Sequence, residues 1–403
     1  MSLNGNAVIG QSGGPTAVIN ASLAGVIEEA KKHDEIQDIY GAVHGVEGLL
    51  AENMADLRAE DDASVSLLPH TPSAALGSCR KKLTEADYER LITVLKAHNI
   101  RYWFYIGGND SADTTHQVGR LSAEAGWEMR VIGIPKTVDN DLAYTDHCPG
   151  YGSVARFNAL ATRDAGRDTA ALYTVDTVKI VETMGRNAGW ITAATALARE
   201  EPGDPPHLIY LPERVFDPKR FLADITREVE RGRGCVVAVC EGLRDASGEA
   251  IVSFKHALGT DSFGHKQLGG VGDYLVNLIA EELGIKARFD KAGTIQRSFA
   301  LAHSEVDVAE AKMVGAAAVQ RACEGVTDKM ITLERVSQNP YRCGTGLASL
   351  EDVANAERPV PDEFISPEGN DVTSAFIDYA RPLIGGPLPP YARLKLHPVP
   401  KKL

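Results

Sequence analysis

The strongest indication of the fold in this sequence is the segment Val131-Ile-Gly-Ile-Pro-Lys-Thr-Val-Asp-Asn-Asp141. Its apolar start, Val131 to Ile134, is typical of a buried strand. Lys136, Asp139 and Asp141 follow that strand directly. The two aspartates alternate, so an extended segment would point both carboxylates the same way. Charges at the end of a buried strand cost solvation free energy unless a ligand or a metal compensates them. The segment therefore predicts a strand with a functional site at its carboxyl end.

Two other segments repeat this arrangement with glycines in place of the proline. The apolar run Tyr102 to Ile106 precedes Gly107-Gly108-Asn109-Asp110-Ser111. Asn6 to Ile9 precedes a turn containing Gly13-Gly14, and a helix-like run from Ala17 to Ala30 follows. Glycines permit positive φ and close approach of the backbone to a ligand. The amino end of the following helix favours an anion. Both segments therefore indicate phosphate binding.

Further strand-like runs extend the pattern, at residues 178–181, 207–211 and 235–239. Strands that alternate with helices predict an α/β fold with parallel sheets and active residues at the strand carboxyl ends. The runs form two groups, before and after about residue 150, which predicts two stacked α/β domains with a cleft between them.

Simpler interpretations of the individual motifs stay open. Gly13-Gly14 could be a structural turn, and Asp110 or Ser111 could cap a helix. Arg186 and Arg297 could be surface charges, although the planar guanidinium suits a phosphate. Glu241 could form a structural salt bridge instead of accepting hydrogen bonds from substrate hydroxyls.

Taken together, these residues favour phosphoryl transfer. That reaction needs bound phosphates, neutralised charge and a base for the attacking hydroxyl, which the glycine turns, Lys136 and the paired aspartates could supply. There is no G-x-x-x-x-G-K-[ST] loop and no G-x-G-x-x-G at the first turn, which disfavours common NTPases and dinucleotide dehydrogenases.

Composition narrows the class of protein. The chain has 403 residues and a net charge of −13, which argues against general nucleic-acid binding. No segment has the uninterrupted apolar length of a membrane span. The six cysteines lack metal-ligand spacing and are expected to be reduced and structural in a cytoplasmic protein. The eleven histidines also show no paired-ligand spacing, which disfavours a structural zinc site.

At this point the chain resembles the phosphofructokinase family. The similarity follows family order over most of the first 300 residues. It comprises Ser12-Gly13-Gly14-Pro15, Gly77-Ser78-Cys79-Arg80, Gly107 to Ser111, Pro135 to Asp141, Met184-Gly185-Arg186, Glu241-Gly242 and Gln296-Arg297. The resemblance implies two Rossmann-like three-layer domains with parallel-rich sheets and an active site in the cleft between them. It also implies discontinuous domains: residues 1–150 with roughly 305–360 for the phosphate donor, and 151–304 with roughly 361–403 for the sugar phosphate.

Two residues resemble the pyrophosphate-dependent branch of the family. ATP-dependent members typically carry glycine where this chain has Asp110 and Lys136. A carboxylate at position 110 would repel the α-phosphate of a nucleotide, and Lys136 could stabilise the transferring phosphoryl group. The resemblance therefore implies reversible transfer of phosphate from pyrophosphate to fructose 6-phosphate, with Mg²⁺ as cofactor. It implies neither a nucleic-acid partner nor a membrane partner.

The resemblance also assigns roles to individual residues. Asp139 would be the base, acting with Lys136 and Asp110 at the reacting phosphate. The sugar phosphate would be bound by Thr137, Val138, Asp139, Met184, Gly185, Arg186, Glu241, Thr294 and Arg297. Pyrophosphate would be bound by Gly14, Arg80 and Lys136, with Ser78 as a further candidate.

Asn109 departs from the family pattern, because members often carry a magnesium-binding aspartate there. An amide oxygen is a weaker ligand for Mg²⁺ than a carboxylate, so pyrophosphate oxygens, waters, Asp110 or Asp139 would share the metal. The alternatives are an ATP-dependent 6-phosphofructokinase, an NAD or lipid kinase with a related glycine loop, and a non-catalytic regulatory subunit. The family also implies a homodimer or a higher homo-oligomer.

Overall fold

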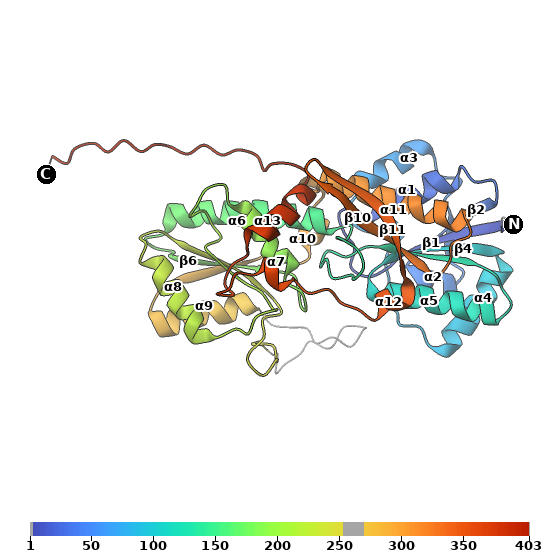
Figure 1. Ribbon diagram of the computed structural model, residues 1–403, viewed down its shortest axis with the longest axis horizontal. Coiled ribbons are helices and arrows are strands. Elements are labelled where there is room, and N and C mark those ends of the chain that lie inside the picture. The colour runs from blue at the N-terminus through green and yellow to red at the C-terminus, as the bar shows by residue number, and fades with distance from the viewer. Residues whose placement is uncertain (1–2, 253–269, 403) are drawn as a thin grey trace.

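The computed structural model describes residues 3–252 and 270–402. Two sheets, each with helices on both faces, form two bodies that lie side by side (Figure 1). The predicted α/β class with parallel-rich sheets is confirmed. Within the described ranges, no helix is long and apolar enough to cross a membrane.

The first sheet has the strand order β11-β10-β5-β4-β1-β2-β3. Its strands are β1 (Gly5–Gln11), β2 (Ile36–Ala42), β3 (Met54–Asp56), β4 (Ile100–Gly107), β5 (Arg130–Pro135), β10 (Lys329–Gln338) and β11 (Tyr341–Ser349). The edge strands β3 and β11 are antiparallel to their neighbours, and the strands between them are parallel. The helices around it are α1 (Ile19–Ala30), α2 (Gly45–Leu50), α3 (Asp62–Leu67), α4 (Glu85–Ala97), α5 (Asn109–Glu124), α11 (Glu305–Cys323) and α12 (Leu350–Ala354).

Alternating apolar residues place helices on both faces of this sheet. Ile9 and Phe104 belong to the core cluster beneath α1 and α11, whereas Val8 and Trp103 belong to the cluster beneath α2, α4 and α5. Successive strand residues point to opposite faces, so a strand that is apolar at every position must be covered on both. The carboxyl ends of the strands stay uncovered and face the second body.

Two glycines bring the segment after residue 304 onto this first body. A Cβ atom added at Gly25 in α1 would lie 2.1 Å from the carbonyl oxygen of Lys312. One added at Gly315 in α11 would lie 2.1 Å from the carbonyl oxygen of Ser22. Only glycine permits the two helix backbones to approach so closely. Helix α11 therefore packs directly on α1.

The second sheet is smaller, with the strand order β7-β8-β6-β9 and parallel pairing throughout. Its strands are β6 (Val178–Thr183), β7 (Leu208–Tyr210), β8 (Cys235–Cys240) and β9 (Ala287–Lys291). Its helices are α6 (Tyr151–Leu172), α7 (Trp190–Ala194), α8 (Pro218–Val229), α9 (Val271–Leu283), α10 (Ile295–Ser298) and α13 (Ser374–Ala380). Helices α8 and α9 cover one face, and α6 and α7 cover the other.

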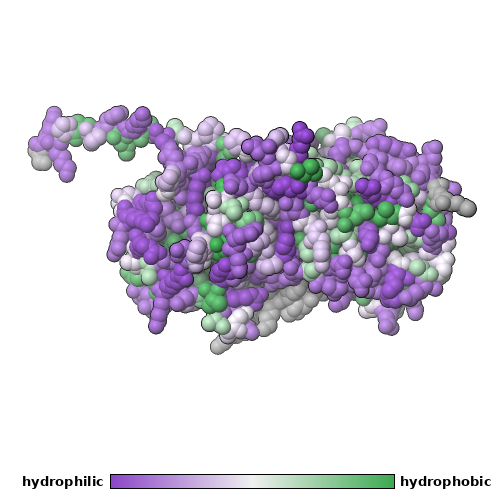
Figure 2. Space-filling view, in the orientation of Figure 1, coloured by the Kyte–Doolittle hydropathy of each residue, from purple (hydrophilic) through white to green (hydrophobic). Residues whose placement is uncertain are grey.

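The segment after Arg358 returns to this second body. Val360, Ile365, Phe376 and Leu383 are buried in the cluster that contains α6 and α7. Residues 387–402 form no helix or strand; Tyr391 and Arg393 bind Asp164 and Asp204 of the second body, and the chain then continues as an extended tail (Figure 1). In Figure 2 the visible face of both bodies is mostly hydrophilic, with apolar residues scattered singly. The two discontinuous domains divided near residues 150, 305 and 360 stay our proposal.

A buried histidine joins the loop after β5 to α11 and to the β10–β11 hairpin, which the sequence pattern did not predict. His147 lies 2.8 Å from Asp146 Oδ1 through Nδ1 and 2.7 Å from Glu310 Oε2 through Nε2. Arg335 also pairs with Asp146, and Tyr341 donates its hydroxyl hydrogen to Glu310. Burial disfavours the charged imidazole, but the hydrogen bonds to the two carboxylates outweigh burial and raise the pKa of His147 to about 8.

We expect this group to make the protein less stable at alkaline pH. Because the pKa is raised on folding, its stabilisation is complete below about pH 6.5 and is lost as the pH rises through about 8, a change of about 2 kcal/mol. Urea unfolding of the native protein and of His147→Gln at both pH extremes measures it. The variant should be less stable at the lower pH and show a flatter pH dependence. Equal slopes for the two proteins would contradict the prediction.

Candidate active site

The turn after β1 lies against three cationic side chains. Lys136 donates from Nζ to the carbonyl oxygen of Gly14 at 3.0 Å. Gly13 has φ +76°, and a Cβ atom there would lie 3.1 Å from Lys136 Nζ. A Cβ atom at Gly14 would lie 2.8 Å from Arg297 Nη1 and 3.5 Å from Arg80 Nη2. The two glycines therefore leave the space in which Lys136, Arg80 and Arg297 converge. We name these three residues the donor cations, because the phosphate donor is expected to bind beside Gly14.

The donor cations form a site for a strongly anionic ligand. Lys136 is buried, and burial followed by repulsion from Arg80 and Arg297 lowers the pKa of its ammonium to about 8. Three cations this close repel one another, so a multiply charged anion between them relieves the repulsion. Ser78 supports the turn by donating its hydroxyl hydrogen to the carbonyl oxygen of Gly13 at 2.6 Å.

The loop after β5 bends instead of running extended, which corrects our expectation for Asp139 and Asp141. Asn140 between them has φ +56°. Its side chain accepts a hydrogen bond from the backbone N–H of Cys148 and donates one to Tyr379 Oη, both at 2.9 Å. Asparagine tolerates this left-handed conformation better than most residues. Both carboxylates still line the same cavity, because the bend and not the strand pleat brings them together.

Asp139 has the properties of a general base. Its Oδ1 is screened from solvent and has no hydrogen-bond partner among the described residues. Its backbone N–H donates to Thr137 Oγ1 at 3.1 Å, which stabilises the backbone of the loop that carries it. Burial, and then repulsion from Asp141 and Glu241, raises the pKa of Asp139 to about 7. An open acceptor whose pKa is near neutrality suits proton abstraction from a hydroxyl group.

We expect a bell-shaped pH dependence of kcat/KM for phosphorylation. Activity should rise with pH through about 7 as the pair containing Asp139 loses its proton, and fall through about 8 as Lys136 loses its charge. Steady-state assays across this range measure the two limbs. Lys136→Arg should remove the alkaline limb and leave the acidic one, since arginine stays charged. Retention of the alkaline limb in that variant would exclude Lys136 as its cause.

Residues after the strands of the second sheet face the donor cations. Arg186, after β6, lies 3.7 Å from Glu241 Oε1, after β8, and burial raises the pKa of Glu241. The buried Gln296 accepts a hydrogen bond from the backbone N–H of Met184 at 3.2 Å and donates to the carbonyl oxygen of Gly293 at 2.8 Å. Gln296 therefore joins the β6 loop to the segment that carries Thr294 and Arg297, and its role is structural.

The amino end of α5 carries Asn109 and Asp110. The N-cap residue is Gly108, and neither Asp110 nor Ser111 caps the helix, so that simpler interpretation is wrong. Asn109 donates from Nδ2 to the carbonyl oxygen of Ala356 at 3.1 Å. Its Oδ1 is buried and has no hydrogen-bond partner within residues 3–252 and 270–402. That orphaned amide oxygen fits a hard cation such as Mg²⁺, which prefers oxygen ligands.

Apart from Ser78, which supports the glycine turn, the predicted site residues line one cavity of about 580 Å³ between the two sheets. They are Gly14, Arg80, Asn109, Asp110, Lys136, Thr137, Val138, Asp139, Met184, Gly185, Arg186, Glu241, Thr294 and Arg297. Their individual roles stay predictions. The guanidinium of Arg297 lies close to Gly14 and Arg80, and its expected contact with the sugar phosphate stays a prediction.

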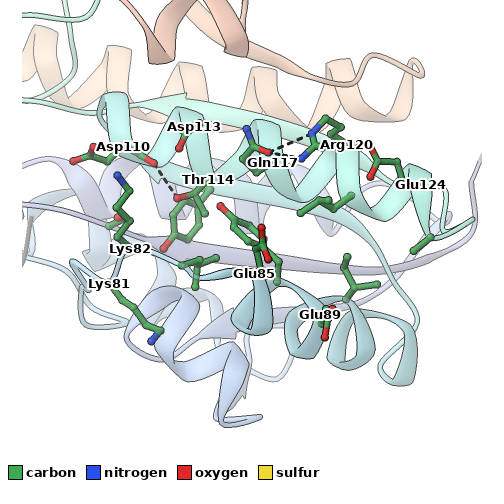
Figure 3. A pocket seen from close by; sticks show the side chains of 17 residues that line it. Lys81, Lys82, Glu85, Glu89, Asp110, Asp113, Thr114, Gln117, Arg120 and Glu124 are labelled. Atoms are coloured by element: carbon green, nitrogen blue, oxygen red, sulfur yellow. Dashed lines mark hydrogen bonds and ion pairs between the residues drawn. The ribbon is translucent and has the colours of Figure 1, made fainter.

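A larger cavity of about 690 Å³ lies beside this one, between α4 and α5 (Figure 3). Ser12 and Asp110 line both cavities, so Asp110 stands where they meet. The larger cavity carries opposite charges close together, including Lys82, Glu85 and Asp113.

Sequence reasoning missed the residues that act through long-range contacts. Arg358 donates to the carbonyl oxygens of Asn140 (2.8 Å) and Thr145 (2.6 Å) and so holds the loop that carries Asp139. Glu182 and Lys291 also line the cavity. The position of Glu182 at the carboxyl end of a predicted strand was the one available signal for it.

A glycine turn ringed by cations, facing a buried carboxylate across a cleft between two α/β bodies, defines a phosphotransferase. The phosphofructokinase family profile matches residues 6–322. The pyrophosphate–fructose 6-phosphate 1-phosphotransferase of Xanthomonas campestris pv. campestris is 44% identical over 415 residues, covering 99% of this chain and 98% of that protein. The chain belongs to the phosphofructokinase family.

Two solved structures support this assignment. The pyrophosphate-dependent phosphofructokinase from Nitrosospira multiformis is 42% identical and superimposes with a TM-score of 0.87 over 99% of each chain. The pyrophosphate-dependent phosphofructokinase from Marinobacter aquaeolei is 40% identical, with a TM-score of 0.86 over 99% of this chain and 98% of that one. Both similarities span both bodies of the fold.

Proposed function

We propose that this protein transfers a phosphoryl group from pyrophosphate to the C1 hydroxyl of fructose 6-phosphate, giving fructose 1,6-bisphosphate and phosphate. The observation that carries this function is the open Oδ1 of Asp139 beside Lys136 and the turn at Gly14. Four relatives named for this activity each match 99% of the chain. The ATP-dependent alternative is not favoured by them.

The cavity divides the reaction between its two sides. The donor cations bind pyrophosphate, and the residues after β6 and β8 bind the sugar phosphate. Asp139 takes the proton of the C1 hydroxyl as the C1 oxygen bonds to phosphorus, while the bond from phosphorus to the bridging oxygen breaks. Lys136 stabilises the charge on the transferring group and on the phosphate that leaves. In the reverse direction, protonated Asp139 returns its proton to the C1 oxygen.

Mg²⁺ fits the donor side of this site, where Asn109 Oδ1 would be its ligand from the chain. When bound, the metal would neutralise part of the charge of pyrophosphate. We also propose that the protein acts in the cytoplasm as a homodimer or a higher homo-oligomer. The free cysteines among the described residues support a reducing compartment.

The test is a coupled assay with fructose 6-phosphate and magnesium that compares pyrophosphate with ATP as donor. We expect turnover with pyrophosphate in both directions and little with ATP. Turnover with ATP alone would keep the sugar site and overturn the donor assignment. The remaining alternative, a regulatory subunit, predicts no turnover with either donor and no binding of substrate in calorimetry.

A further inference from the structure

A second cationic site lies on the side of the cavity formed by the small sheet. Lys291 ends β9, and its Nζ lies 2.6 Å from Oε1 of Glu182 on the neighbouring strand β6. The Glu182 side chain is 0% exposed, whereas that of Lys291 is 37% exposed and lines the cavity. Neither residue belongs to the motifs that the sequence analysis assigned.

Both carboxylate oxygens of Glu182 accept hydrogen bonds from neighbouring groups. Its Oε1 accepts from Lys291, and its Oε2 accepts from the backbone N–H of Gly272 at 2.7 Å, at the start of α9. A buried carboxylate is tolerated only when such partners compensate its charge. The ammonium of Lys291 has three donor hydrogens, and Glu182 is its one hydrogen-bond partner among the described residues. Two donors are therefore left for a ligand in the cavity.

A sugar phosphate needs positive charge at the side of the cavity away from the donor cations. Arg297 Nη1 lies beside Gly14, and Arg186 is the one other cation among the residues expected to bind the sugar phosphate. Thr294 offers only a hydroxyl group. With the C1 hydroxyl at Asp139, the C6 end of the sugar must extend away from the donor cations. A dianionic phosphate there needs a further cation.

Lys291 lies where that cation is required. It stands three residues before Thr294, and its charge acts on Glu241, which we expect to bind the sugar hydroxyls. Arg186 acts on the same carboxylate. Resting on the proposed function, we infer that Lys291 binds the 6-phosphate of the sugar substrate and that Glu182 is the positioning residue that aims it.

The first test separates the affinities for the two substrates. Lys291→Met should raise KM for fructose 6-phosphate by about 10- to 100-fold, the range of one charge-assisted hydrogen bond. It should leave KM for pyrophosphate and kcat within about threefold, since the bond is present in ground and transition states alike. Lys291→Arg should recover part of the loss. Glu182→Gln should also raise KM for the sugar phosphate, without a change for pyrophosphate.

A matched control is Lys286→Met. Lys286 directly precedes β9, pairs with Asp176 at 2.6 Å and does not line the cavity. Both KM values should stay at the native level in this variant. If Lys291→Met behaves in the same way, the Lys291–Glu182 pair is structural only and the inference is wrong, while the proposed function stands.

Calorimetry without a donor tests the inference independently of turnover. Fructose 6-phosphate should bind the native protein at least 10-fold more tightly than Lys291→Met, and fructose should bind both proteins equally weakly. Equal affinity of the two proteins for fructose 6-phosphate would overturn the inference. Failure of the native protein to bind fructose 6-phosphate would overturn the proposed function and the inference together.

Discussion

Asp139→Asn is expected to lower kcat for fructose 6-phosphate phosphorylation by about 10³-fold and to change the KM values by only a few-fold. Asparagine keeps the shape of the side chain but cannot accept the proton of the C1 hydroxyl, and a positioned base contributes about 10² to 10⁴-fold. The loss should be as large for the reverse reaction, because protonated Asp139 is the acid there. Steady-state kinetics in both directions measure it.

Asp141→Asn is the matched control for that experiment. The two carboxylates line the same cavity, but among the described residues Asp139, unlike Asp141, has a screened oxygen without a hydrogen-bond partner. Because the charge of Asp141 raises the pKa of Asp139, its removal should move the acidic limb of the pH profile to lower pH and leave most of kcat. Near-native turnover in Asp139→Asn would remove the basis of the proposed mechanism. Equal losses in the two variants would show that the carboxylates act as a pair.

The sequence predicts those parts of the fold that local patterns determine. Apolar runs such as Tyr102 to Ile106 become central strands, since a strand covered on both faces must be apolar at every position. The glycine turn at Gly13 and the charges after Pro135 also lie in the cavity as expected. Each of these motifs directly follows a strand. Because the strands are parallel, their carboxyl ends lie at the same edge of the sheet, and the motifs therefore lie close together.

The features of the structure that the sequence did not predict depend on contacts between residues distant in the chain. The bend at Asn140 is stabilised by Tyr379 and Arg358, more than 200 residues away in the chain. The residues next to Asn140 in the sequence do not indicate this bend. Arg297 has a flexible side chain, and its place beside Gly14 depends on how the two bodies meet. The pairing of Glu182 with Lys291 depends on β6 and β9 being neighbours, which is a property of topology.

Asp110 lies where the cavity of the donor cations meets the larger cavity. It lines both cavities, and the larger one, at about 690 Å³, has the size of sites that bind small organic molecules. Asp110 is exposed. Solvent therefore screens its repulsion of a nucleotide α-phosphate, which we expect to be about 1 to 2 kcal/mol.

Asp110→Gly should therefore raise kcat/KM for ATP by about 5- to 30-fold, the factor that corresponds to that repulsion. Asp113→Gly is the control. Asp113 carries the same charge one turn further along α5, and it lines the larger cavity but not the cavity of the donor cations. The second barrier is Lys136, whose buried ammonium occupies space beside Gly14. Asp110→Gly combined with Lys136→Gly should lower activity with pyrophosphate by about 10² to 10³-fold, since a preorganised cation is lost, while ATP use persists. Assays with both donors decide the matter: a double variant that accepts no ATP would mean that other residues close the larger cavity to nucleotides.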